Sequence, residues 1–481
     1  MKNMNTPLYS ALMAYSKQKK PFHMPGHKLG TFGEMKRIDL TALDVTEANG
    51  LDNLYEAEGI IQEAMQAMSR FYGSQSTLFL TNGSTAGILA SLMSVCKPGD
   101  QILIARNCHH SVWHALILIG AMPIYIQPEY DEAFGVMGAI SPQTVQQALL
   151  RYPDVKGAVV VSPTYEGIVS EIKEIAQVLH EQGKVLIVDE AHGAHFVVNE
   201  NFPQSSIGQG ADLVIQSMHK TLPTLTQSAL LHRGTSAIEE EDLIQHLRLI
   251  QTSSPSYVMM GLMDYIRGFI EENKLEIQKH YIDPLKRMRQ NLSNMKKLKL
   301  LDLPQVCYDQ SKIVILTQGS GIDGYTLGQY LETDYAIVAE AMLPHLVILM
   351  TTVADNQSTL SELEKALKEI DDTLVKKAQG EDLEVPYAYI MQSILKEVEP
   401  IQKPEMSLRE VYYKKAEWAL AELCIGRICA QPIMLYPPGI PIIGLGECIK
   451  EIHIDLIKQY AQHLKGLKDR DGQMHCKVLD I

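Results

Sequence analysis

The chain has 481 residues, of which 46% are hydrophobic and 21% are charged, so it is a globular protein long enough for two or three domains. Its formal net charge is -14, and no cluster of Lys and Arg offers a site for nucleic acid. The seven cysteines are scattered without the spacing of a zinc or redox site, and we expect reduced thiols and no metal. No secretory stretch and no run of about 18 apolar residues occurs, which predicts a cytoplasmic protein without a membrane partner.

Between about residues 76 and 235, short apolar runs alternate with segments of helical period. The runs are rich in Val, Ile and Leu, as expected for strands that are buried on both faces of a parallel sheet. This pattern predicts an α/β domain with a mostly parallel sheet. The expected strands are Ser76 to Leu80, Gln101 to Ala105, Ile124 to Ile126, Lys156 to Val161, Lys184 to Val188 and Ala211 to Ile215, with helices at Ala86 to Val95 and Ile172 to Gln182.

The pattern changes after Pro284. Strands near 313–316, 336–340 and 346–352 with helices near 325–331 and 358–370 predict a small α+β domain. Residues 376–384 have the polar composition of a linker, 407–423 are expected to be helical, and the prolines of 436–441 predict an extended turn. The expected division is an N-terminal arm (1–50), a large domain (51–284), a small α+β domain (285–375) and a C-terminal α+β domain (385–481).

Small residues follow the first expected strand, in the run Thr81 to Gly87. Backbone N–H groups at the start of a helix, together with the hydroxyls of Ser84 and Thr85, could bind a phosphate group. A tight turn with a serine N-cap is the alternative.

Asp189 follows the strand that ends at Val188, so it is expected at the ligand-binding edge of the sheet. There a carboxylate could hold the proton on the ring nitrogen of a pyridoxal cofactor. Two alternatives remain: a metal site with Glu190, His192 and His195, or a helix cap.

Lys220 ends the run Ser217 to Lys220, after the strand 211–215. Desolvation at a buried strand end favours a neutral amine, which can form a Schiff base. Ser217 and His219 could reach a phosphate, whereas a surface lysine that snorkels into solvent is the alternative. His109, after the strand 101–105, could stack on a cofactor ring, or it could be a solvated loop histidine.

Separated motifs in chain order extend this pattern over nearly the whole length, and with them the chain resembles the bacterial ornithine/lysine/arginine decarboxylases. These are fold-type I enzymes that use pyridoxal 5'-phosphate, and the resemblance is to the short Gram-positive members without an N-terminal wing domain. The motifs include Phe22 to Lys28, Asn82 to Thr85, Asn107 to Ser111, Ser162 to Gly167, Asp189 to Gly193, Ser217 to Lys220, Thr252 to Tyr257 and Tyr436 to Gly439.

The resemblance implies a role for each of these site residues. Lys220 would bind the cofactor covalently, Asp189 would hold its ring nitrogen, and His109 would stack on the ring. The expected phosphate ligands are Ser84, Thr85, Ser217 and His219, and Ala191 would also contact the cofactor. The family works as a homodimer, or as a higher assembly, in which Ser253 and Ser254 would reach the cofactor of the neighbouring subunit.

The implied reaction is decarboxylation of a basic amino acid, with arginine the first expectation and lysine or ornithine next, in the biosynthesis of polyamines. Glu447 or Glu166 would pair with the substrate's cationic end, and His219 or Lys220 would donate the proton that replaces the carboxylate. Tyr55 and His110 depart from the family pattern near the expected cofactor mouth. An aldolase, an aminotransferase, or a pyridoxal-phosphate-binding regulatory protein without turnover are the alternatives.

Overall fold

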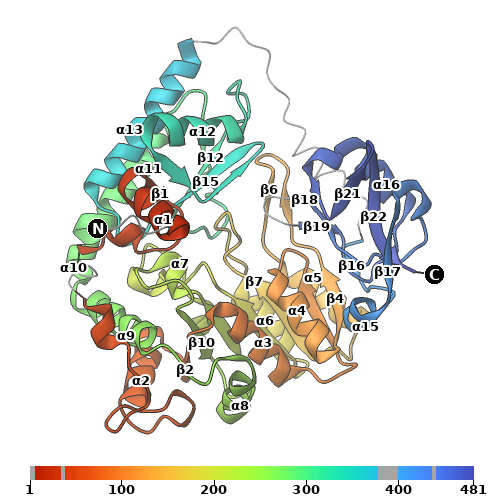
Figure 1. Ribbon diagram of the computed structural model, residues 1–481, viewed down its shortest axis with the longest axis horizontal. Helices are drawn as coiled ribbons and strands as arrows, with labels where there is room; N and C mark the ends of the chain where they lie inside the picture. Colours follow the sequence, from red (N-terminus) through yellow and green to blue (C-terminus); the bar gives the residue numbers. More distant parts are fainter. Residues whose placement is uncertain (1–5, 34–37, 377–398, 436–439, 481) are drawn as a thin grey trace.

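The centre of the protein is an eight-stranded sheet with the order β16-β4-β3-β7-β8-β9-β10-β2 (Figure 1). The computed structural model describes residues 6–33, 38–376, 399–435 and 440–480. The strands β3, β4, β7, β8 and β9 are parallel, whereas β10 is antiparallel to β9 and β2, and β16 is antiparallel to β4. The predicted, mostly parallel sheet is therefore confirmed, and β10 and β16 were not predicted. The bounds are β2 (Ser76–Leu80), β3 (Gln101–Ala105), β4 (Met122–Ile126), β7 (Gly157–Val161), β8 (Val185–Asp189), β9 (Leu213–Gln216), β10 (Ala229–Arg233) and β16 (Ile401–Gln402).

Helices cover both faces of this sheet, and the strands alternate their side chains between the two cores. Ile102 and Ile104 of β3 lie in a core shared with α3 (Gly83–Val95), α4 (His110–Ile119) and α8 (Glu240–Ile250). Leu103 and Ala105 lie in the opposite core. That core is shared with α2 (Ile60–Tyr72), α5 (Pro142–Arg151), α6 (Ile172–His180) and α9 (Tyr257–Glu272). Burial on both faces explains why the strands are almost continuously apolar.

A second, antiparallel sheet has the order β11-β12-β15-β14. It contains β11 (Lys299–Leu300), β12 (Lys312–Leu316), β14 (Ala341–Leu343) and β15 (Leu346–Met350), accompanied by α12 (Gly324–Tyr335) and α13 (Gln357–Lys376). The elements predicted in this region are present. The expected boundary at residue 284 falls inside α11 (Asp283–Leu292), the last of several helices between β10 and β11.

The C-terminal part contains two three-stranded sheets, β17-β22-β21 and β19-β18-β20. The predicted helix over 407–423 is wrong: α15 (Leu408–Tyr413) ends early, and β17 (Ala416–Leu420) pairs with β22 (Gln473–Leu479). This long-range pairing overrides the local helical pattern. The predicted linker beyond residue 376 and the turn at 436–439 lie outside the described residues. The other elements are β18 (Ile433–Leu435), β19 (Ile440–Ile443), α16 (Glu451–Tyr460), β20 (Leu464–Lys465) and β21 (Leu467–Arg470).

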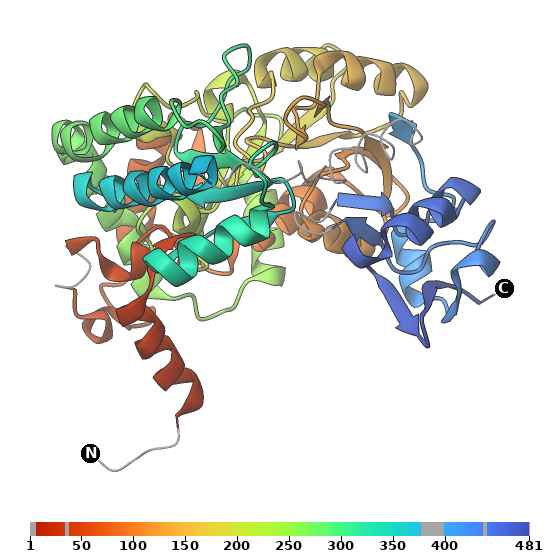
Figure 2. The same cartoon turned by 90° about the horizontal axis from the view of Figure 1, so that it is seen from above.

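The N-terminal helix α1 (Pro7–Gln18) projects from the body of the molecule (Figure 2). No residue of α1 is buried, and Leu8 and Leu12 are 72% and 59% exposed. The chain then adds β1 (Lys20–Phe22) parallel to β13 (Ile337–Ala339) beside the second sheet. The apolar side of α1 is thus uncovered in this chain. Across the described parts of the chain, no helix combines the length and hydrophobicity needed to cross a bilayer.

Candidate active site

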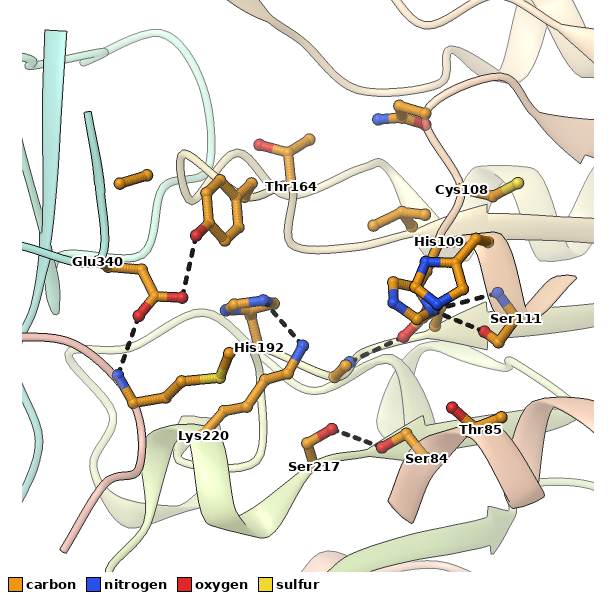
Figure 3. Close-up of a pocket in the computed structure, with 18 of the residues that line it drawn as sticks. Ser84, Thr85, Cys108, His109, Ser111, Thr164, His192, Ser217, Lys220 and Glu340 are labelled. Carbon is orange, nitrogen blue, oxygen red and sulfur yellow. Dashed lines mark hydrogen bonds between the residues drawn. The ribbon is translucent and has the colours of Figure 1, made fainter. Parts of the chain in front are cut away.

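A cavity of about 1190 Å³ lies at the carboxyl ends of the parallel strands, where open α/β sheets bind their ligands. Each of five strands is followed by, or ends in, a residue that lines it: Ser84 after β2, His109 after β3, Glu166 after β7, Asp189 at the end of β8 and Lys220 after β9. The topology of the sheet therefore gathers residues that are far apart in sequence. Figure 3 shows Lys220 and His192 between Glu340 on one side and His109 on the other.

One end of the cavity carries hydrogen-bond donors that suit a phosphate group. Ser84 and Thr85 lie in the first turn of α3, and the Ser84 hydroxyl is hydrogen-bonded to the hydroxyl of Ser217 (Figure 3). Gly83 has a φ of +74°, which a residue without a side chain adopts easily as the chain turns into the helix. The N–H groups of a first helical turn have no acceptor within the helix, so this end attracts an anion. Three of the expected phosphate ligands, Ser84, Thr85 and Ser217, are thus on one wall of the cavity.

Asp189 and Lys220 are two ionisable residues of the cavity, and each affects the pKa of the other. Asp189 is buried and accepts a hydrogen bond from the Ala191 N–H at 3.2 Å. Burial raises the pKa of Asp189 and the nearby Lys220 opposes this, while burial lowers the pKa of Lys220 and Asp189 opposes that. Lys220 lies in the short helix α7 (Met218–Thr221) with its amine in the cavity, so the alternative of a lysine that snorkels to the surface does not apply.

The two alternatives for Asp189 also find no support. The next helical turn begins at Phe196 and has His195 as its N-cap residue, so Asp189 caps no helix. Within the described ranges, no cluster of three or more His, Cys, Asp or Glu residues is arranged to bind a metal ion.

Two of the histidines that line the cavity, His109 and His219, have defined hydrogen-bond partners. His109 is the N-cap residue of α4, and its Nδ1 lies 2.9 Å from the Ser111 hydroxyl. Enclosure by the cavity walls, together with His110 and Lys220, lowers the pKa of His109 to about 4, so its ring is neutral at physiological pH. The Nδ1–H of His219 donates to the Ser228 carbonyl at 3.0 Å, and burial lowers its pKa. A neutral ring suits the stacking expected for His109, whereas the Nε2 of neutral His219 is left without a proton for a phosphate or for Cα.

The donor set of the cavity fits pyridoxal phosphate. Hydroxyls and helix N–H groups suit its phosphate, and the Lys220 amine suits its aldehyde. Asp189 is buried with a single donor, the Ala191 N–H, among the described residues, so it retains acceptor capacity for a protonated ring nitrogen. A buried carboxylate is stable in charged form when such a cationic partner is present.

The two expected substrate carboxylates are in different places. Glu166 is buried at the cavity wall, and burial raises its pKa. Glu447 is not among the residues that line the cavity; its oxygens accept hydrogen bonds from Arg106 at 2.8 and 2.7 Å. The sequence reasoning missed this pair because Arg106 and Glu447 are separated by more than half of the chain.

The residues expected to act across subunits lie apart from the cavity of their own chain. Ser253 and Ser254 are exposed, and neither is among the described residues that line the cavity. The Tyr55 hydroxyl donates to the Thr252 carbonyl at 2.7 Å, so this departure from the family pattern lies beside the same segment. The other departure, His110, does line the cavity and contacts His109, with ring centroids 3.8 Å apart and ring planes tilted by 43°.

Further residues in or directly behind the cavity were not predicted. Glu340 accepts hydrogen bonds from the Met24 N–H and the Tyr165 hydroxyl, each at 2.9 Å. His192 contacts both Lys220 and Lys312. Glu340 and Lys312 come from the second sheet and its flanking loop, and only the tertiary structure brings them to this site. His192 lies in the run Asp189 to Gly193, and its place in that run was the available sequence signal for its position at the site.

Comparisons with known proteins show which family this chain is similar to. Residues 6–320 match the family described as Orn/Lys/Arg decarboxylase, major domain. A Bacillus subtilis relative named Uncharacterized protein YaaO is 36% identical, over 98% of each chain. An arginine decarboxylase of Bacillus anthracis is 31% identical, over 94% of this chain and 92% of its own.

Solved structures of similar fold include the Escherichia coli constitutive lysine decarboxylase, with a TM-score of 0.76 and 20% identity, over 98% of this chain and 82% of that one. L-threonine transaldolase from Pseudomonas fluorescens has a TM-score of 0.59 at 15% identity, over 81% and 90%. The expected fold, that of fold-type I enzymes, is confirmed by these neighbours. From the family match and the relatives that span it, the chain belongs to the Orn/Lys/Arg decarboxylase family.

Proposed function

We propose that this protein decarboxylates a basic amino acid with pyridoxal 5'-phosphate, arginine being the first candidate and lysine or ornithine the next. The observation that carries the proposal is the convergence of Lys220, Asp189 and the phosphate-binding turn at Ser84 on one cavity. Arginine comes first because relatives with 29% to 31% identity are named arginine decarboxylases.

Bound pyridoxal phosphate supplies the electron sink that accepts the electrons of the Cα–carboxylate bond. The wall with Ser84 and Ser217 binds the phosphate, and the carboxylate of Asp189 holds a proton on the ring nitrogen. The Lys220 amine would hold the cofactor through its aldehyde, and it would be a free amine beside Cα when substrate is bound. His109 would lie against the ring. After carbon dioxide leaves, Lys220 Nζ donates a proton to Cα; His219, the other expected donor, is a neutral ring with its proton on Nδ1, so its Nε2 has none to give.

The distal cation of the substrate meets carboxylates at the other side of the cavity. Glu340 is half-buried there, and its two hydrogen bonds leave acceptor capacity for an ammonium or guanidinium group. Glu166 is buried at the same cavity, where its charged form is less favoured. We therefore place the substrate's cation at Glu340, with Glu166 beside it.

The proposed assembly is a homodimer. Ser253 and Ser254 would contribute to the partner's cavity, and the uncovered apolar side of α1 would be buried between subunits.

The test is a product assay of the purified protein with added pyridoxal phosphate and with arginine, lysine or ornithine in turn. Carbon dioxide and the matching amine should form in equal amounts with at least one of them. Lys220→Ala should abolish both products and the covalent capture of the cofactor, while Lys156→Ala, a change at a lysine 48% exposed, should leave them unchanged. Keto acid or aldehyde products would instead indicate an aminotransferase or an aldolase, and cofactor binding without any product would indicate a regulatory protein.

A further inference from the structure

The N-terminal segment 22–28, which we call the strap, is held at both ends by the part of the chain that contains the second sheet. It begins where Phe22 of β1 pairs with Ala339 of β13. It ends at Lys28, which is only 2% exposed and donates a hydrogen bond from Nζ to the Met350 carbonyl at 2.6 Å. The position of the strap is therefore tied to that of the second sheet.

The middle of the strap is bonded to the turn that carries Lys220. The Gly26 N–H donates to the His219 carbonyl at 2.7 Å, and this carbonyl belongs to the peptide bond directly before Lys220. A Cβ at Gly26 would lie 2.5 Å from the oxygen and 2.9 Å from the nitrogen of Leu222, so any other residue would force the two backbones apart. The absence of a side chain at Gly26 thus lets the strap lie directly against the turn.

The strap also holds the carboxylate that we propose for the distal cation of the substrate. Two residues before Gly26, the Met24 N–H donates to Glu340 Oε2 at 2.9 Å, and Figure 3 shows the Glu340 carboxylate at one side of the cavity. Two residues of chain span at most about 7 Å, and the ring of Pro25 between them restricts the backbone. The strap is therefore a short and stiff link between Glu340 and the turn of the proposed cofactor lysine.

A hydroxyl group at the end of the second sheet completes this arrangement. Thr352, which follows β15 and is 2% exposed, donates from Oγ1 to the Gly26 carbonyl at 2.8 Å. The backbone of Gly26 is thus bonded to the lysine turn through its N–H and to the second sheet through its carbonyl. Because a buried hydrogen bond is costly to leave unmade, these bonds hold the turn and the second sheet in one relative position.

We propose that the strap is a spacer: it sets the distance between the Lys220 amine and the Glu340 carboxylate, and with it the length of the basic amino acid that the site accepts. Met24, Gly26 and Thr352 are positioning residues, since they act through Lys220 and Glu340. One methylene more or less changes recognition by a shaped pocket about 10- to 200-fold, so a fixed spacing can select among chain lengths. The inference rests on the proposed function, because it takes the two ends of the substrate to lie at Lys220 and at Glu340.

The experiment measures a length profile with α,ω-diamines of three to six carbons as probes. Their dissociation constants from the protein loaded with pyridoxal phosphate are obtained from the change in absorbance. One amine takes the place of Lys220 on the cofactor, and the other pairs with Glu340. The parent should bind one length at least about tenfold more tightly than its neighbours in the series.

Two variants change the strap without touching the cavity side chains. In Thr352→Val, which loses the hydroxyl that bonds the Gly26 carbonyl, the preference for the best length should fall about threefold or more, because the strap can move against the second sheet. In Gly26→Ala the preferred length should change, because the added Cβ pushes the lysine turn away from the strap. Should either variant fail to fold, the other decides.

Thr351→Val is the matched control. Thr351 is also 2% exposed, but its hydroxyl bonds the Ser311 carbonyl and the Tyr281 hydroxyl instead of the strap. It should lose a similar amount of stability and leave the length profile unchanged, which separates positioning from a general loss of packing.

Equal binding of all four diamines by the parent would overturn the proposal. So would an unchanged profile in a folded strap variant, or an equal change in Thr351→Val. A length preference that depends on the strap, without carbon dioxide from any basic amino acid, would support the spacer and reject the proposed decarboxylation alone.

Discussion

Arg106 and Glu447 form a bidentate ion pair in which the two side chains are only 3% and 1% exposed. Arg106 follows β3 of the large sheet, and Glu447 belongs to the C-terminal part, where it also accepts the Gly444 N–H at 2.6 Å. The pair joins these two parts of the chain. The carboxylate of Glu447 is therefore occupied by Arg106 and the Gly444 N–H. Its position does not match the expected pairing with substrate.

Glu447→Gln should destabilise the protein by about 3–5 kcal/mol, because it leaves the Arg106 charge buried without its partner. Urea unfolding at pH 7 measures this loss. Burial acts to raise the pKa of Glu447, but Arg106 outweighs it and the pKa lies below the ordinary 4.5. A carboxylate with a depressed pKa stabilises the fold fully above pH 4.5, and this contribution is lost as the pH falls further. The difference in the free energy of unfolding between Glu447→Gln and the parent should therefore shrink below pH 4.5.

Glu451→Gln, at an exposed carboxylate of α16, is the control for this change and should alter stability by no more than about 0.5 kcal/mol. Unchanged stability of Glu447→Gln, combined with a loss of activity toward basic substrates only, would restore Glu447 as a substrate residue.

Asp189→Asn should weaken cofactor binding about a hundredfold, which corresponds to the loss of about 3 kcal/mol when a buried ion pair loses one charge. Titration of the protein with pyridoxal phosphate, followed by absorbance, gives the dissociation constant. The control is Glu190→Gln, whose carboxylate is equally buried but bonds Ser205, Ser206 and Gln216 away from the cavity. If both variants retain the cofactor equally well, Asp189 does not hold the ring nitrogen.

Glu340→Gln should raise KM for the preferred basic amino acid by about 10- to 100-fold, the usual effect of removing a hydrogen bond to a charged group. Steady-state kinetics with amine detection measure it. Glu166→Gln should have a smaller effect. Glu332→Gln, at a carboxylate that pairs with Lys19 outside the cavity, should have none. A fall in kcat with unchanged KM for Glu340→Gln would argue against substrate recognition by this side chain.

Mixed subunits test the contribution of Ser254 across the dimer. Lys220→Ala and Ser254→Trp should each inactivate their own homodimer. Equal mixtures, denatured and refolded together, should recover about a quarter of the activity, since random pairing gives mixed dimers that each hold one intact site. No recovery, or a monomeric mass in sedimentation of the active protein, would contradict the proposed assembly.

The grouping of these side chains at one cavity could be predicted because parallel strands bring their carboxyl ends to one edge of the sheet. Once the strands before Asp189 and Lys220 are recognised from their apolar runs, their ends must lie near each other in the sheet. The same logic places His109 and the turn at Ser84. The missed parts depend on pairing over long distances in sequence: β17 joins β22 rather than extending a helix, and Glu447 meets Arg106 rather than a substrate.

The sequence by itself determined the α/β class, the active edge of the sheet and the family resemblance, because apolar periodicity and strand-end residues are local signals. Only the tertiary structure decided which carboxylates face the cavity and that His192 connects Lys220 to Lys312. These relationships arise where the second sheet packs against the first, and no local pattern specifies which side chains meet across such a contact. Local motifs therefore indicate which residues line the cavity, whereas packing decides which further side chains contact them.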